Sequence, residues 1–128
     1  MIDTNIAIRA RHGSEVVFAK LLEHAGPVVM SALSLAEMQG GLYASVEHAA
    51  LWRARLAVLL EALPVNPFGR DAAEAYGLIV ADMGWSRSRQ MDRLIAVHAL
   101  AMQTTLVTAN TADFVGVPGL RIENWLIA

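Results

Sequence analysis

The sequence contains no cysteine. This absence excludes disulfide bonds, thiolate metal sites and cysteine nucleophiles from the chemistry of the protein. A chain without cysteine also fits a reducing cytoplasm, where disulfides rarely persist. We therefore expect a cytoplasmic protein whose activity depends on other side chains.

Charged residues are scarce as well. They make up 17% of the chain, whereas hydrophobic residues make up 55%, which is the opposite of a disordered composition. The 128 residues suit a single compact domain, expected to span positions 1–128, with enough length to bury a core. The formal net charge is −2, so no global positive field favours nucleic acid. Any contact with RNA must therefore come from a local patch.

We expect neither a signal peptide nor a membrane span in this sequence. Asp3 and Arg9 interrupt the N-terminus before an apolar stretch can form. The longest run without an acid or a base covers residues 94–112 and approaches the length of a membrane span. This run contains His98, Gln103, Asn110 and several threonines, which would be costly in hydrocarbon. A buried helix followed by a buried strand explains it better, and we expect no membrane partner.

Hydrophobic periodicity and breaker residues predict an alternation of strands and helices. The opening five residues read as the stub of a strand that runs into a turn. We expect helices over residues 14–24, 34–43, 46–63, 70–83 and 88–102, strands over 28–30, 105–108 and 120–122, and a loop over 110–114. This order predicts an α/β domain with a mostly parallel sheet. In such sheets the functional crevice lies at the carboxyl ends of the strands.

Among the twelve acidic residues, Asp3, Glu37, Asp92 and Asp113 do not read as ordinary solubilising residues. Each lies beside apolar residues or close to the end of a strand. Each also has a local structural explanation. Asp3 fits a helix cap, Glu37 completes a capping box with Ser34, Asp92 suits the first turn of its helix, and Asp113 suits an Asx turn.

Taken together, the four acids make a stronger case than each does alone. Asp3 ends the first strand and Asp113 follows the predicted strand at 105–108, so both should face the same edge of a parallel sheet. Carboxylates gathered there repel one another and raise each other's pKa values, unless a cation neutralises them. Oxygen ligands of this kind select Mg²⁺ or Mn²⁺. We therefore hypothesise a metal site that positions water to attack a phosphodiester.

At these positions the sequence resembles the PIN-domain ribonucleases, and specifically the VapC-like toxins of bacterial toxin–antitoxin pairs. The resemblance rests on four ordered motifs and spans the whole chain. The motifs are residues 1–6 (MIDTNI), 31–37 (SALSLAE), 92–99 (DRLIAVHA) and 108–114 (TANTADF), and the last is followed by VPGL at 117–120 and Asn124-Trp125. The order and the family-like intervals make the resemblance specific.

This resemblance implies a fold, an activity and partners. The fold would be a three-layer α/β sandwich whose central, mostly parallel sheet of four to five strands is flanked by helices. The activity would be Mg²⁺-dependent endoribonuclease cleavage, with Mn²⁺ as a substitute, that acts on tRNA or rRNA and inhibits translation. The partners would be a second copy of the chain and a cognate antitoxin, whose tail typically occupies the active-site groove.

The resemblance also implies roles for particular residues. Carried over by position, the metal-binding and water-activating acids would be Asp3, Glu37, Asp92 and Asp113, supported by Asn5, Thr108 and Asn110. Arg87, Arg89 and Arg93 surround the third motif and are candidates for RNA contact, or for an ordinary solvated face.

The chain departs from the family pattern at three places. Only two residues precede Asp3, so we expect a shortened start or a misassigned initiation codon. Ala109 stands where the family often has asparagine, and Trp85-Ser86-Arg87 replaces an apolar or proline-containing link before the third motif. The groove beside Asp92 is therefore expected to be unusual.

Two other functions compete with the ribonuclease interpretation. One is a nuclease of the same fold that acts on structured DNA, and the other is an inactive PIN-like scaffold that only binds a partner protein. An aspartyl-phosphate mechanism is disfavoured because Asn5 stands where a second acid would be needed. The four histidines show no metal-ligand spacing, and His98 reads as a hydrogen-bonded core residue.

Overall fold

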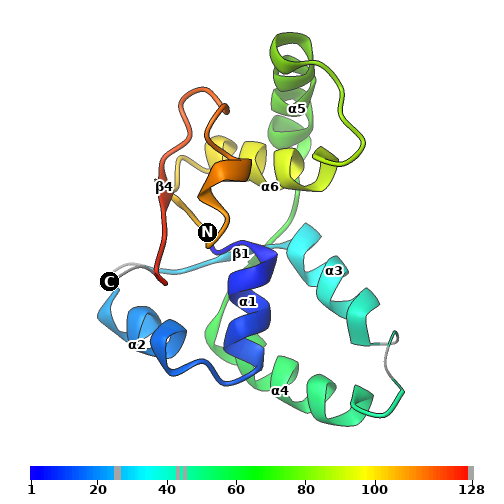
Figure 1. Cartoon of the computed structure of the whole chain (residues 1–128), viewed down its shortest axis with the longest axis vertical. Coiled ribbons are helices and arrows are strands. Elements are labelled where there is room, and N and C mark those ends of the chain that lie inside the picture. Colours follow the sequence, from blue (N-terminus) through cyan, green and yellow to red (C-terminus); the bar gives the residue numbers. More distant parts are fainter. Residues whose placement is uncertain (25–26, 43, 45, 127–128) are drawn as a thin grey trace.

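The computed structural model describes residues 1–24, 27–42, 44 and 46–126 (Figure 1). Helices dominate these residues, and the strands are short. The helices are α1 (Thr4–Arg11), α2 (Glu15–Glu23), α3 (Ala32–Leu42), α4 (Ala49–Ala62), α5 (Arg70–Met83), α6 (Gln90–Ala101) and the 3-10 helix η1 (Thr111–Asp113). The strands are β1 (Met30–Ser31), β2 (Val65–Asn66), β3 (Leu106–Val107) and β4 (Ile122–Glu123). None of the described helices is long and apolar enough to cross a membrane.

The strands pair in parallel. Strand β1 pairs with β2, and β3 pairs with β4. Ile2 joins the two pairs, because it forms parallel bridges to Met30 on one side and Val107 on the other. The order across the sheet is therefore β2–β1–Ile2–β3–β4. The predicted α/β architecture with a parallel sheet is confirmed, and the opening strand contributes the single residue Ile2 to the ladder.

Apolar side chains pack on both faces of this sheet. Figure 1 shows α5 and α6 on one side of the strands and α1, α2 and α4 on the other. One core cluster joins Ile6 of α1 to Val17 of α2 and Leu56 of α4. The other joins Ile95 of α6 to Leu106 of β3 and Phe114. The sheet is therefore covered by an apolar cluster on each face, as is usual for parallel sheets.

Helix α1 was not given a range in the predicted order of elements, which placed a turn after Asp3, although Asp3 was also interpreted as a possible helix cap. In the structure, Asp3 caps this helix, and its Oδ1 accepts a hydrogen bond from the Ile6 backbone N–H at 2.9 Å. Ile6, Ala7 and Ala10 form its buried face. The spacing of these three residues is helical, and the short length of the segment hid that signal.

The predicted capping box at Ser34 is wrong. Helix α3 begins at Ala32, and the hydroxyl of Ser31 accepts a hydrogen bond from the Leu33 backbone N–H at 3.0 Å. Ser31 therefore supports the first turn, three residues before the predicted cap, and Ser34 lies buried within the helix. Glu37 is consequently not occupied in capping, and its carboxylate is available for another role.

Other element boundaries differ by a few residues. The long helix starts at Ala49 rather than at residue 46, and the helix of the third motif starts at Gln90 rather than 88. Strand β2 was not predicted, and the other strands are two residues long. The predicted end of the 34–43 helix at Tyr43 lies outside the described residues. Gly84 ends α5 as predicted, with φ of 78°.

Candidate active site

Asp3 lies at the centre of the sheet's carboxyl edge. It directly follows Ile2, its backbone N–H donates to the Val107 carbonyl at 2.9 Å, and its side chain is 5% exposed. Burial raises the pKa of the Asp3 carboxyl, hydrogen bonds from Thr108 and from the Ile6 backbone oppose the rise, and the charge of Glu37 adds to it. The structure thus holds a desolvated carboxylate in place through specific donors.

Glu37 reaches this edge from the second turn of α3. Its Oε1 accepts a hydrogen bond from the Thr4 hydroxyl at 2.6 Å, and the same hydroxyl lies 2.9 Å from Ser34 Oγ. Thr4 therefore links the residue after Asp3 to the helix that carries Glu37. Thr4 and Ser34 were not among the predicted site residues, and the signal that could have indicated a role was their place inside the first two motifs.

Asp92 lies in the first turn of α6 and is half-buried. Burial raises the pKa of the Asp92 carboxyl, and the charges of Asp113, Asp3 and Glu37 raise it further, in that order. The guanidinium of Arg89 opposes this rise. The structure therefore brings the other three acids close enough to act on Asp92 electrostatically.

Asp113 ends η1 and remains exposed. Its Oδ1 lies 3.8 Å from Arg89 Nη1, and the same guanidinium nitrogen donates to the Asp113 backbone carbonyl at 3.4 Å. Arg89 therefore bridges the start of α6 and the η1 segment. Its positive charge partly compensates the acidic edge.

The acids surround a common region rather than forming a closed cage. Within the described residues, no three His, Asp or Glu side chains lie close enough together to hold one metal ion directly. This spacing still suits Mg²⁺, which keeps several of its waters and takes only one or two carboxylates as direct ligands. The donors are carboxylate oxygens, which are the ligands that hard divalent cations prefer. The donor set therefore fits Mg²⁺ or Mn²⁺.

Thr108 lies behind Asp3 and is fully buried. Its hydroxyl helps to hold the Asp3 carboxylate and accepts a hydrogen bond from the Asn110 backbone N–H at 3.0 Å. These contacts fit the predicted supporting role of Thr108. Asn5 contributes a backbone hydrogen bond to Asp3, while the side chains of Asn5 and Asn110 are exposed.

The three predicted RNA-contacting arginines have different environments. Arg87 and Arg89 are exposed. Arg93 is only 9% exposed, and its Nη1 donates to the Gly84 carbonyl at 2.6 Å. The predicted RNA contact of Arg93 is therefore not compatible with the structure, because this side chain is buried and its guanidinium binds the backbone between α5 and α6.

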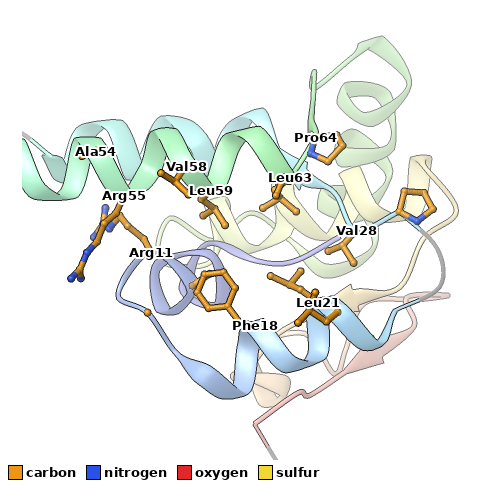
Figure 2. Close-up of a pocket in the computed structure, with 15 residues that line it drawn as sticks. Arg11, Phe18, Leu21, Val28, Ala54, Arg55, Val58, Leu59, Leu63 and Pro64 are labelled. Atoms are coloured by element: carbon orange, nitrogen blue, oxygen red, sulfur yellow. The ribbon is translucent and has the colours of Figure 1, made fainter.

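An apolar groove of about 820 Å³ lies away from the acidic edge. Figure 2 shows it between α2 and α4, with Phe18 and Leu21 facing Val58 and Leu59 across the opening. None of the four acids lines it. The molecule thus presents an acidic edge and a separate apolar groove.

Comparison with known proteins identifies the class. Residues 1–120 match the PIN domain family, so the chain belongs to the PIN-domain family. The predicted family and fold are confirmed.

Particular relatives are similar over almost the whole chain. Ribonuclease VapC2 of Rickettsia felis is 32% identical, and the alignment covers 98% of this chain and 96% of that protein. A chain in the crystal structure of VapBC2 from Rickettsia felis bound to a DNA fragment from their promoter superposes with a TM-score of 0.85 at 30% identity, covering 98% and 97% of the two chains. DNA-bound VapBC from Salmonella typhimurium gives 0.87 at 26% identity, with coverage of 98% and 96%.

Proposed function

We propose that this protein is a divalent-metal-dependent endoribonuclease and the toxin of a toxin–antitoxin pair that inhibits translation. The observation that carries the proposal is the electrostatic coupling of Asp92 to Asp3, Glu37 and Asp113 at the carboxyl edge of a parallel sheet. A fold that keeps such a self-repelling set has a use for a cation there. The similarity to a protein named Ribonuclease VapC2 supports RNA as the substrate.

The residues of such a site would have different roles. Asp3 and Asp92 would hold Mg²⁺, with Glu37 and Asp113 at its periphery. When bound, the cation would supply positive charge beside the scissile phosphodiester and favour water as the attacking group. Thr4 orients Glu37, and Thr108 orients Asp3. Arg89 would turn from Asp113 towards an RNA phosphate, since a guanidinium pairs well with both anions.

The partners follow from the same relatives. The similar structures are VapBC assemblies, so we assign this chain a cognate antitoxin. The groove between α2 and α4 suits an apolar helical segment of that antitoxin, because Phe18 and Val58 expose 45% and 66% of their surfaces there. A homodimer, a tRNA or rRNA substrate and a cytoplasmic location complete the proposal.

The test is a cleavage assay with purified protein, bulk tRNA and rRNA, and DNA of matched sequence, in Mg²⁺ and after chelation. We expect RNA to be cut only with the metal, and Asp92→Asn to lower the rate by at least about 100-fold, because an acid that acts at the reacting centre is removed. Asp71→Asn is the matched control, since Asp71 is exposed on α5 and is not among the charges that act on Asp92. Equal cutting of DNA would favour the structured-DNA nuclease, and metal-independent cutting would contradict the proposal.

A further inference from the structure

Trp52 of α4 lies among several cationic or titratable side chains. The guanidinium carbon of Arg11 lies 4.9 Å from the centre of the Trp52 ring, and that of Arg55 lies 5.9 Å away. The centre of the His12 ring lies 4.1 Å from that of Trp52 with the two planes tilted by 57°, and His48 meets Trp52 edge-on at 5.6 Å. Cations over an aromatic face are held in place without an anion. Arg11 Nη2 also lies 3.4 Å from His12 Nε2, whereas within the described residues no hydrogen bond uses the terminal nitrogens of Arg55.

The positive charge of this cluster is not balanced locally. Among the described residues, neither Arg11 nor Arg55 forms an ion pair with a carboxylate. The Nε of Arg11 is buried and has no hydrogen-bond partner within the described part of the chain. Buried donors are normally satisfied, so an unpaired one needs an explanation. The accessible part of the Arg11 side chain lines the groove, so an anion of another molecule placed there would compensate the charge, although not the buried Nε itself.

The cluster opens into the apolar groove. Arg11 and Arg55 both line it, and Figure 2 shows them next to each other at the end of the groove opposite Val28 and Pro64. The rest of the lining is largely apolar, with Phe18 and Val58 well exposed. An occupant that matches this surface has an apolar stripe and a negative charge at one end.

We propose that Arg11 and Arg55, held against Trp52, form a carboxylate-binding site that anchors an acidic side chain of the antitoxin segment seated in the groove. The identity of the partner rests on the proposed toxin function, whereas the chemistry of the site rests on the cluster itself. Two planar guanidinium groups bind a carboxylate through paired hydrogen bonds and fix its register along the groove. RNA fits less well, because its phosphates would leave the apolar wall exposed to water.

To test the proposal, a library of displayed random peptides is screened for binding to the full chain. The affinity of the selected peptides is then measured by fluorescence anisotropy. We expect the selected peptides to share an Asp or Glu beside an apolar stripe. Changing that acid to its amide, or making Arg55→Met in the protein, should each weaken binding by at least about tenfold, as expected for a charge-assisted hydrogen bond. Combining the two changes should cost little more than either alone.

Further variants of the protein test whether the peptides bind at the two arginines and in the groove. Arg9→Met is the control, because Arg9 is exposed on α1 and does not line the groove, and it should leave binding unchanged. Arg55 is exposed, so Arg55→Met tests the site even if Arg11→Met fails to fold. Val58→Glu should abolish binding if the peptides occupy the groove.

The proposal is overturned if no peptide is selected, if the selected peptides share no acid, if Val58→Glu leaves their binding intact, or if Arg55→Met binds them as the wild type does. It is also overturned if Arg55→Met slows RNA cleavage, which would assign the arginines to RNA. If the wild type binds acidic peptides but cuts no RNA, the carboxylate site stands and the proposed nuclease function fails.

Discussion

The surroundings of Asp92 shift the pKa of its carboxyl in opposite directions. Burial and three neighbouring carboxylates disfavour its charge, while Arg89 favours it. In the absence of metal, the ionised side chain therefore costs the folded state free energy. The same feature that suits cation binding makes the site a source of instability when no cation is bound.

Asp92→Asn should therefore raise the stability of the metal-free protein. The pKa of Asp92 is raised above the ordinary value of 3.8, so the wild type loses stability as pH rises from about 4 through the folded pKa. The variant lacks this loss, so we expect its free energy of unfolding at neutral pH to exceed that of the wild type by about 0.5 kcal/mol. The effect is small because solvent screens this half-buried group. Thermal melts in chelator at several pH values measure it. A lower melting temperature at neutral pH would show that Asp92 has a structural role instead.

His98 is another titratable residue whose pKa is shifted by burial. Burial lowers its pKa below 6.5, a backbone hydrogen bond with Pro67 partly opposes this, and Nδ1 lies 2.8 Å from Ser31 Oγ. These contacts connect α6 to the residue that supports the start of α3. His98 is thus a hydrogen-bonded core residue, as predicted from the sequence.

The stability of the protein should fall as pH drops below about 6.5, since the unfolded chain then takes up a proton that the folded His98 resists. His98→Gln should flatten this slope, although it lowers stability overall by about 1 to 3 kcal/mol through disturbed packing and hydrogen bonding. Urea denaturation of the wild type and the variant at pH values from roughly 5 to 7.5, the range in which histidine titrates, measures the two slopes. Parallel curves would contradict the assigned protonation state.

At the scale of elements, the connection between α5 and α6 depends on a buried cation. Arg93, at 9% exposure, donates to the carbonyl of Gly84, the residue that ends α5 with φ of 78°. This bond holds the loop immediately before the helix that carries Asp92. The position of that acid therefore depends on a residue that the sequence presented as a surface arginine.

Arg93→Met should destabilise the protein by about 1 to 3 kcal/mol, the usual contribution of a hydrogen bond from a charged donor, because the bond from the buried guanidinium to the Gly84 carbonyl is lost. Arg87→Met is the control and should have little effect, since Arg87 is exposed. Chemical denaturation compares them. Equal stability of the two variants would mean that the Arg93 bond contributes nothing.

Helices and strands differed in how well the sequence predicted them. The helices of residues 70–83 and 88–102 followed from periodicity and breaker residues, because several turns repeat the signal. The predicted strands at 28–30, 105–108 and 120–122 overlap β1, β3 and β4 but have different bounds, and β2 was missed, since two residues are too few to carry a period and the partner strands are distant in sequence. Strand β2 exists because Val65 and Asn66 lie opposite Met30 and Ser31, a pairing that no local pattern contains.

At the scale of the molecule, the grouping of the acids followed from one topological rule. Parallel strands present their carboxyl ends at one edge, which predicted that Asp3 and Asp113 would lie near each other. The hydroxyl of Thr4 and the burial of Arg93 depend on side-chain packing between helices, which the sequence does not encode locally. The cationic cluster around Trp52 was missed for the same reason, because its residues come from α1 and α4.

The most direct test of the central claim is a Mn²⁺ titration of the chelator-treated protein, beside Asp92→Asn and the control Asp71→Asn, followed by the electron paramagnetic resonance of free Mn²⁺. It needs no knowledge of the RNA target. The account predicts saturable binding by the wild type and the control, weakened at least about tenfold in Asp92→Asn, because a direct carboxylate ligand is lost. Equal binding by all three proteins, or none at millimolar Mn²⁺ with and without an RNA oligonucleotide, would contradict a metal site at the acidic edge.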